Sequence, residues 1–308
     1  MTTVTTATTE REPEGIVLVD KPRGLTSHDV VALARRALGT RAVGHAGTLD
    51  PMATGLLVVL VGRATKLSQW LTADDKRYLA TVRLGETTAS LDADGAVTAT
   101  APVPEGALDE AVIRAALASM EGPSMQVPPA VSAIKVGGVA MHERARRGEA
   151  VTLDARPVTI HRAALLSVKS EAREVDLELH ASKGFYVRSF GRDLAAALGT
   201  VGHLTALRRV ASGAMSVDEA VDGELLRRAK GDEAARGAVR AALRPVREAA
   251  RWMRSVTVDE PAATALGHGK RVASEGEDGV LLVLGPDGDP VCVAERREGV
   301  LVVARGMR

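Results

Sequence analysis

Alternating apolar and polar residues predict several short β-strands along the chain. The segment GIVLVDKP (15–22) is an apolar run that Pro22 ends. From Tyr78 to Leu84 every second residue is apolar and shares one strand face, and 158–168 and 174–181 alternate in the same way. The alternating segments predict β-strands with one buried face, and 15–22 predict a short apolar strand.

A second apolar run is ambiguous between strand and helix. GLLVVLVG (55–62) is either a buried strand or the first turns of a buried helix, because its periodicity does not distinguish the two.

Helical spacing of apolar residues predicts several helices. Residues 29–38 fit a helix that Ser27 caps and Gly39 ends, and 218–251 are charged, Ala-rich and helical. In SKGFYVRSFGRDLAAALG (182–199) a strand or turn passes into a helix ended by Gly199. A further helix is predicted over 108–120, with Leu108, Val112, Ala115, Ala116 and Leu117 on its apolar side.

Composition divides the chain into three parts. The Thr-rich residues 1–14 predict a disordered N-terminal tail, and 15–252 an α+β domain. Short Val-rich strands around PDGDP predict a small β-rich module over 253–308. The Pro- and Gly-rich stretch after Glu121 predicts a long ordered loop, and the basic segment 142–151 a short helix or hairpin tip.

Charge is nearly balanced overall but not along the sequence. The 308 residues include 40 Lys and Arg against 39 Asp and Glu, which excludes a uniformly basic nucleic-acid binder. Residues 21–90 nevertheless carry ten basic and five acidic side chains, and 130–215 carry thirteen and eight. Two such blocks either form one face for a polyanion or are simply a solvated charged surface.

Several classes of protein are excluded. The single cysteine, Cys292, forms no internal disulfide framework and fits a reducing, cytoplasmic setting. The chain start lacks the basic and apolar regions of a secretory signal, and no apolar run approaches the roughly 18 residues of a membrane span. The sequence contains no phosphate-binding glycine loop or dinucleotide fingerprint, and its seven histidines are too scattered along the chain to predict a metal cluster.

The segment GHAGTLDP (44–51) is the densest candidate for chemistry. Its glycines allow a sharp turn and close approach to another molecule, and Pro51 biases Asp50 toward an extended backbone. Asp50 is a candidate nucleophile or general base, and His45 a candidate acid, base or stacking surface. The alternative is a structural turn in which Asp50 caps a helix after Pro51.

Two further segments combine aromatic and basic residues. In DKRYLATVRLG (75–85), Tyr78 follows Lys76 and Arg77, which suits a stacked nucleobase near phosphates but also a core tyrosine at a strand end. In SKGFYVRSFGRD (182–193), Lys183 and Arg188 are candidates to bind a phosphate or a carboxylate. There, Tyr186 and Arg188 are predicted to share a strand face.

Taken together, the motifs resemble those of the TruB-type tRNA pseudouridine synthases. The motifs, in family order, are DKPRGLTSHDVV (20–31), GHAGTLDPMATGLL (44–57), DKRYLATVRLG, AIKVGG (133–138), SKGFYVRSFGRDL and TALRRV (205–210). The resemblance implies the pseudouridine synthase fold, with a mixed, mainly antiparallel central sheet flanked by helices and loops. It also implies a PUA-like, RNA-binding C-terminal module, although 253–308 match less closely.

The resemblance also implies the reaction and the residues that perform it. Uridine at position 55 in the T-loop of tRNA would be isomerised to pseudouridine, without metal or cofactor, by an enzyme acting as a monomer on the T-arm. By this resemblance Asp50 matches the essential aspartate, Arg188 the partner of its carboxylate, and Tyr78 the tyrosine that stacks on the flipped base. Tyr186 matches a pocket wall, Leu207 a contact near the uracil, and His45 the residue that contacts the RNA where the base has left. Lys21 and Pro22 match residues that support the active-site loop. Lys183 is a candidate RNA contact.

One position departs from the family. Where the family commonly reads Thr-Asp-Thr-x-Asp, this chain has TTASLD, with Ala89 at the first acidic position, which puts a turn or RNA contact in doubt. Two alternatives to the leading prediction are an RNA-binding or RNA-folding protein with a vestigial pocket, and the same chemistry on another T-loop-like RNA. The arginines at 144, 146 and 147 suggest a clamp on RNA or a solvated helix.

Overall fold

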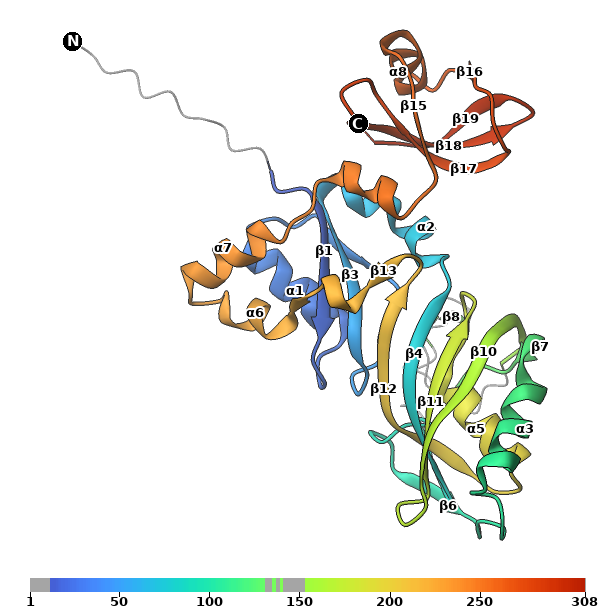
Figure 1. Ribbon diagram of the computed structural model, residues 1–308. Helices are drawn as coiled ribbons and strands as arrows, with labels where there is room; N and C mark the ends of the chain where they lie inside the picture. Colours follow the sequence, from blue (N-terminus) through green and yellow to red (C-terminus); the bar gives the residue numbers. More distant parts are fainter. Residues whose placement is uncertain (1–11, 131–134, 137–138, 141–152, 308) are drawn as a thin grey trace.

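A ten-stranded mixed sheet forms the centre of the molecule in the computed structural model, which describes residues 12–130, 135–136, 139–140 and 153–307 (Figure 1). Its main path is β14-β1-β3-β12-β4-β11-β10-β7, with β2 paired to β3 and β13 to β12. Only the β1–β14 and β3–β12 pairs are parallel. The strands are β1 (Gly15–Lys21), β2 (Val43–Ala46), β3 (Thr54–Val61), β4 (Lys76–Leu84), β7 (Gly122–Gln126), β10 (Arg156–Lys169), β11 (Glu174–Ala181), β12 (Gly202–Ser212), β13 (Met215–Ser216) and β14 (Val221–Asp222).

Helices cover one face of this sheet along its length. The helices α1 (Ser27–Leu38), α6 (Gly223–Arg228) and α7 (Glu233–Ala241) pack beside β1 and β3, while α3 (Glu110–Met120) and α5 (Val187–Ala197) pack behind β10, β4 and β12 (Figure 1). Their apolar side chains join one continuous core with the strands. The remaining short elements are α2 (Ser68–Thr72), the 3-10 helices η1 (Gly62–Leu67), η2 (Val217–Glu219) and η3 (Val246–Arg251), and the strands β5 (Glu86–Thr88), β6 (Val97–Thr100), β8 (Lys135–Val136) and β9 (Val139–Ala140).

The run GLLVVLVG is strand β3, and its position in the sheet explains why it does not alternate. Leu57, Val59 and Val61 belong to the core beneath α1. The intervening residues Leu56, Val58 and Leu60 belong to a second core on the other face. A strand that is buried on both faces is apolar throughout.

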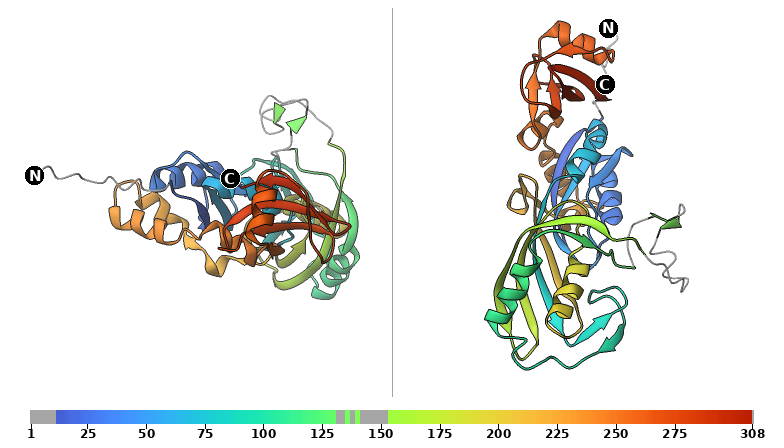
Figure 2. Two further views of the ribbon diagram at one scale, coloured as in Figure 1. Left: turned by 90° about the horizontal axis from the view of Figure 1, so that it is seen from above. Right: turned by 90° about the vertical axis from the view of Figure 1, so that its right-hand side faces the viewer.

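The second core joins the C-terminal residues to the sheet. A five-stranded sheet comprises β15 (Ser255–Thr257), β16 (Val272–Ala273), β17 (Gly279–Leu284), β18 (Pro290–Arg297) and β19 (Val300–Gly306), with α8 (Glu260–Gly267) packed on it. Its Leu282, Val293 and Met307 share an apolar cluster with Ile16 and Leu18 of β1. The C-terminal sheet therefore lies against one end of the ten-stranded sheet, as Figure 1 and the right-hand view of Figure 2 show.

Most predicted elements are present, with several corrections. The N-cap of α1 is Thr26 in a capping box with Asp29, because the Ser27 hydroxyl is bound elsewhere. Residues 122–126 form β7 rather than part of a loop, and β12, a central strand, was not predicted. On α3 the buried residues are Ile113 and Leu117, whereas the predicted Val112 is exposed.

One alternative and one prediction about secondary structure near the chemistry were also wrong. After Pro51 the chain turns, with the Ala53 amide donating to the Asp50 carbonyl at 3.1 Å, and enters β3, so Asp50 caps no helix. Arg188 lies in the first turn of α5, because the strand-like backbone ends at Tyr186. The N-terminal residues 1–11 and the basic segment with arginines 144, 146 and 147 lie outside the described residues. Among the helices that the structure describes, none is long and apolar enough to cross a membrane.

Candidate active site

A pocket of about 280 Å³ opens where four segments of the chain meet. Asp50 comes from the loop between β2 and β3, Tyr78 from β4, Leu207 from β12, and Tyr186 with Arg188 from the start of α5. The structure thus brings five of the eight predicted site residues around one cavity.

The loop that carries Asp50 is held along its whole backbone. Each carbonyl from residue 47 to 51 accepts a hydrogen bond, and the donors come from three different elements and the loop itself. Gly47 has a φ of 91°, which only glycine adopts at little cost, and it allows the turn out of β2. The carbonyls of Gly47 and Thr48 accept from the Arg209 guanidinium, and the carbonyl of Leu49 accepts from the Ser27 hydroxyl. The carbonyl of Asp50 accepts from the Ala53 amide, and that of Pro51 accepts from the Lys21 ammonium and the Gly24 amide. A loop without free carbonyls holds the Asp50 carboxylate in a fixed direction.

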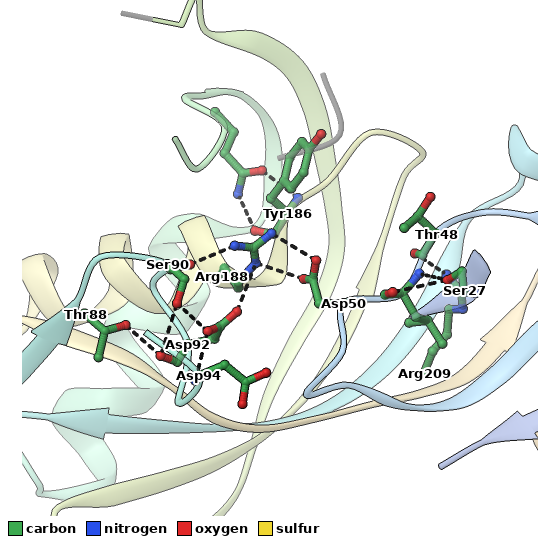
Figure 3. Close-up of polar contacts among 12 residues, drawn as sticks. Ser27, Thr48, Asp50, Thr88, Ser90, Asp92, Asp94, Tyr186, Arg188 and Arg209 are labelled. Carbon is green, nitrogen blue, oxygen red and sulfur yellow. Dashed lines mark hydrogen bonds and ion pairs between the residues drawn. The ribbon is translucent and has the colours of Figure 1, made fainter. Parts of the chain in front are cut away.

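Arg188 binds the Asp50 carboxylate on both oxygens. Its Nη2 donates to Oδ1 at 3.1 Å, and its Nε lies 2.9 Å from Oδ2 (Figure 3). The arginine side chain is 5 % exposed and the aspartate side chain 32 %, so the carboxylate faces the pocket while the guanidinium is enclosed. This geometry leaves Asp50 accessible to a ligand.

A second carboxylate shares the same arginine. Asp92 Oδ2 lies 3.7 Å from Arg188 Nε, and the Ser90 carbonyl accepts from Nη1 at 2.8 Å. Asp92 is itself buried, and it accepts from the Ser90 hydroxyl and from the Asp94 amide. Figure 3 shows the guanidinium between these groups and Asp50.

The electrostatics of Asp50 follow from these neighbours. Burial raises the pKa of the Asp50 carboxyl above its usual value, and the charge of Asp92 adds to the rise. The Arg188 guanidinium, and more weakly the Lys21 ammonium, oppose it. Arg188 is therefore the principal group that favours the ionised form of Asp50.

The pocket walls are mostly apolar and aromatic. Tyr78 is 8 % exposed and Leu207 7 %, so each presents only a small surface to the cavity. Tyr186 is held through its backbone, whose N–H and carbonyl form two hydrogen bonds with the side-chain amide of Gln126, at 2.8 and 3.1 Å. Such walls suit a flat, partly apolar ring.

The other three predicted residues lie outside the lining. Lys21 is fully buried, and its ammonium donates to the carbonyls of Pro22, Leu25 and Pro51, so it supports the loop rather than contacting the pocket. Burial lowers its pKa to about 8. Lys183 is exposed beside the pocket rim.

His45 is half-buried on β2. Its ring lies 5.6 Å from that of His28 in an edge-to-face arrangement. Burial lowers the pKa of His45, and the charges of His28 and Arg209 act in the same direction, which favours the neutral imidazole.

The sequence reasoning gave no role to two residues that shape the site, Arg209 and Asp92, and it noted a third, Lys76, only as a basic neighbour of Tyr78. Arg209 is fully buried beneath Tyr78 and the Asp50 loop, and Lys76 lines the pocket with its pKa lowered to about 8 by burial. Asp92 ends the quoted segment TTASLD, but nothing in that segment indicates a contact with Arg188. A signal for Arg209 existed in the quoted motif TALRRV, where two basic residues interrupt an apolar strand pattern.

Comparison with known proteins shows the family to which the chain belongs. The chain matches the TruB family pseudouridylate synthase (N terminal domain) over residues 35–187 and the tRNA pseudouridylate synthase B C-terminal domain over 188–251. It is 43 % identical to tRNA pseudouridine synthase B of Thermobifida fusca (strain YX) over 292 residues, which is 93 % of this chain and 96 % of the relative. It is 53 % identical to the protein of that name from Nocardia farcinica (strain IFM 10152) over 208 residues, 67 % of each chain.

Solved structures share the fold at lower identity. A Cbf5–Nop10–Gar1 complex contains a chain with a TM-score of 0.71 at 24 % identity, covering 96 % of this chain and 85 % of that one. An H/ACA RNP bound to a substrate RNA containing 2′-deoxyuridine gives 0.69 at 22 %, with the same coverage. These likenesses confirm the predicted fold class. The chain belongs to the TruB family of pseudouridylate synthases, as the sequence motifs predicted.

Proposed function

We propose that this enzyme isomerises uridine to pseudouridine at position 55 in the T-loop of tRNA, with Asp50 as the essential carboxylate. The observation that carries the proposal is the Asp50–Arg188 pair at the mouth of a ring-sized, aromatic-walled pocket. Family membership supports the reaction class, and curated relatives named tRNA pseudouridine synthase B support tRNA as the substrate.

The chemistry needs few groups. The N1–C1′ glycosidic bond of uridine breaks, the uracil rotates, and C5 bonds to C1′. C5 loses its proton to solvent and N1 gains one, so the product is an isomer of the substrate. No electrons enter or leave, so the reaction requires no redox partner. An ionised Asp50 supplies the one reactive carboxylate, and Arg188 keeps it ionised against the effect of burial.

The target base must leave its stack to reach this pocket. Extruding a base costs a few kcal/mol, and stacking on an aromatic ring returns about 1–3 kcal/mol. In the proposal Tyr78 stacks on the uracil, while Tyr186 and Leu207 form the walls beside it. His45 meets the RNA where the base has left.

The remaining parts of the molecule serve RNA binding in this proposal. Lys183 and the two basic segments contact phosphates of the folded T-arm, which is recognised mainly by shape. Residues 253–308 act as a PUA-like RNA-binding domain that follows the catalytic domain 15–252 in the chain. The enzyme works as a monomer in the cytoplasm.

Release of tritium from a T-arm stem-loop with C5-tritiated uridine tests the proposal. Replacement of the C5 hydrogen is obligatory, so wild-type protein is expected to release tritium and Asp50→Ala to release none while still binding the RNA. Release by both proteins would remove Asp50 from the chemistry. Silence from both, with RNA bound, would favour an RNA-folding protein with a vestigial pocket.

The target is tested separately. Full-length tRNA and a variant with a disrupted T-loop fold are compared in the same assay, and activity is expected to require the folded loop. Equal release from both would instead indicate recognition of another RNA feature.

A further inference from the structure

Two histidines and an aspartate meet on the sheet away from the catalytic pocket. His161 lies on β10, His180 on β11, and Asp75 in the turn that leads into β4, three strands that lie side by side in Figure 1. His161 Nε2 is 3.0 Å from Asp75 Oδ2, and the two imidazole rings are 4.8 Å apart. One ligand atom from each of the three residues lies within 4.8 Å of the others.

Strand pairing explains how residues distant in sequence come together. β10 and β11 are antiparallel neighbours, with Ile160 opposite Ala181 and Arg162 opposite His180. His161 is thus the extra residue of a β-bulge, and bulges redirect side chains from the regular alternation. The wide spacing of the histidines along the chain predicted no metal cluster, but this pairing brings two of them into contact.

The cluster is separate from the proposed catalytic machinery. His180 alternates with the core-facing Leu179 and Ala181, so it lies on the sheet face opposite the one that carries Tyr78. None of the three residues lines the Asp50 pocket. The cluster therefore has no role in the site described above.

We propose that Asp75, His161 and His180 form a binding site for a divalent transition-metal ion, with Zn²⁺ as the best match. Two imidazoles and one carboxylate are a donor set that Zn²⁺ uses, with water in the fourth position. The three side chains are half-buried or exposed, so a hydrated ion reaches them.

The three ligand atoms must move modestly to coordinate one tetrahedral ion. With metal–ligand bonds of about 2.0–2.1 Å, the edges of a tetrahedral site are about 3.3 Å long. The His161–Asp75 edge, at 3.0 Å, is about 0.3 Å shorter than this. All three ligand atoms lie within 4.8 Å of one another, so the longest edge must contract by at most about 1.5 Å. Rotation of the exposed His161 side chain supplies such a movement.

Two arginines lie near the three ligands, and their positive charge opposes the binding of a cation. Arg77 lies opposite His180 in the β4–β11 pairing, and Arg162 is adjacent to His161 in sequence. Both are exposed, so solvent screens their repulsion of a cation.

A bound ion would join three segments of the sheet. The Asp75 carbonyl already accepts a hydrogen bond from the Gly213 amide at 2.8 Å, which fixes the turn before β4. Linking its side chain to β10 and β11 stabilises the folded state by mass action. Saturating Zn²⁺ is accordingly expected to raise the Tm.

Metal binding to tag-free, chelator-treated protein tests the inference. Zn²⁺ is titrated in competition with a chromophoric chelator, and Co²⁺ is added separately to record its visible absorption. We expect one strong site per chain, and His161→Ala to weaken it by about tenfold or more. His268→Ala, which removes an exposed histidine at the end of α8, is the matched control and should bind as the wild type does.

The outcomes separate this inference from the proposed function. Asp50→Ala should bind Zn²⁺ normally, whatever its activity. Absence of a strong site, or equal weakening by His161→Ala and His268→Ala, would overturn the proposal. The Zn²⁺-dependent change in Tm of each variant gives a second measure, because the change is independent of the variant's own stability without metal.

Discussion

Asp92 lies 3.7 Å from the guanidinium Nε of Arg188, the same nitrogen that lies 2.9 Å from Asp50. Two carboxylates thus compete for one buried cation. Asp92 also raises the pKa of Asp50 through its charge, whereas Arg188 lowers it. The ionisation of Asp50 is therefore a balance of two opposing neighbours, and each can be removed separately.

Removing Arg188 should shift the acid limb of the enzyme's pH–rate profile to higher pH. In Arg188→Gln the group that opposes the burial effect is lost, so the pKa of Asp50 rises further. If Asp50 reacts as a carboxylate, activity is lost as the pH falls through that pKa, and the acid limb of the pH–rate profile moves to higher pH. Single-turnover rates from pH 5 to 9 measure this shift, and an unmoved limb would contradict the role assigned to Arg188.

Removing the second carboxylate should have the opposite effect. Asp92→Asn keeps an oxygen that can accept from the Ser90 hydroxyl and the Asp94 amide but lacks the charge. The pKa of Asp50 should fall, which moves the acid limb to lower pH, even if the maximal rate also declines because Arg188 is held less firmly. A shift in the same direction as Arg188→Gln would show that Asp92 acts only by positioning the arginine.

Local patterns in the sequence predicted most of the elements but not how they assemble. Alternation identified β4, β10 and β11, because each has one apolar face, while apolar or Val-rich runs identified β1 and the C-terminal strands. Strand β12 was missed because Arg208 and Arg209 interrupt its pattern, and only the structure shows that Arg209 is buried against backbone carbonyls. A buried arginine with tertiary partners cannot be recognised from local periodicity.

The site residues likewise divide into those that the sequence marked and those that only the structure shows. Asp50, Tyr78 and Arg188 stand in segments whose composition or family resemblance marked them, and the structure brings them to one pocket. Asp92 depends on a contact between segments almost a hundred residues apart, and no spacing along the chain encodes that contact. The roles of all these residues remain predictions that the variants above and below address.

The ring of Tyr78 should matter more than its hydroxyl. The side chain is almost wholly buried but lines the pocket, and its hydroxyl interacts with Arg209. Tyr78→Phe keeps the stacking surface and should retain more activity than Tyr78→Leu, for which a loss of about 1–3 kcal/mol in stacking is expected. Tritium release by both variants, with unfolding midpoints as the control for folding, makes the comparison. Equal losses would indicate a role for the hydroxyl instead.

Arg209 should be required for both stability and catalysis, because it organises the loop that carries Asp50. Its guanidinium donates to the carbonyls of Leu56, Thr48 and Gly47 at 2.7, 3.3 and 3.0 Å. A lysine has one nitrogen and cannot reach all three in this planar arrangement. Arg209→Lys therefore leaves buried carbonyls unsatisfied, at a cost of about 1–3 kcal/mol for each.

The adjacent residue provides a matched control for that variant. Arg208 forms a half-exposed ion pair with Asp20, at 2.9 and 2.7 Å, so Arg208→Lys should lose about 1 kcal/mol or less. Urea unfolding should show a clear drop in stability for Arg209→Lys alone. Single-turnover rates under conditions where each protein is folded should also fall only for that variant, because Asp50 is no longer held in one direction. If the two variants unfolded and reacted alike, the loop would not depend on Arg209.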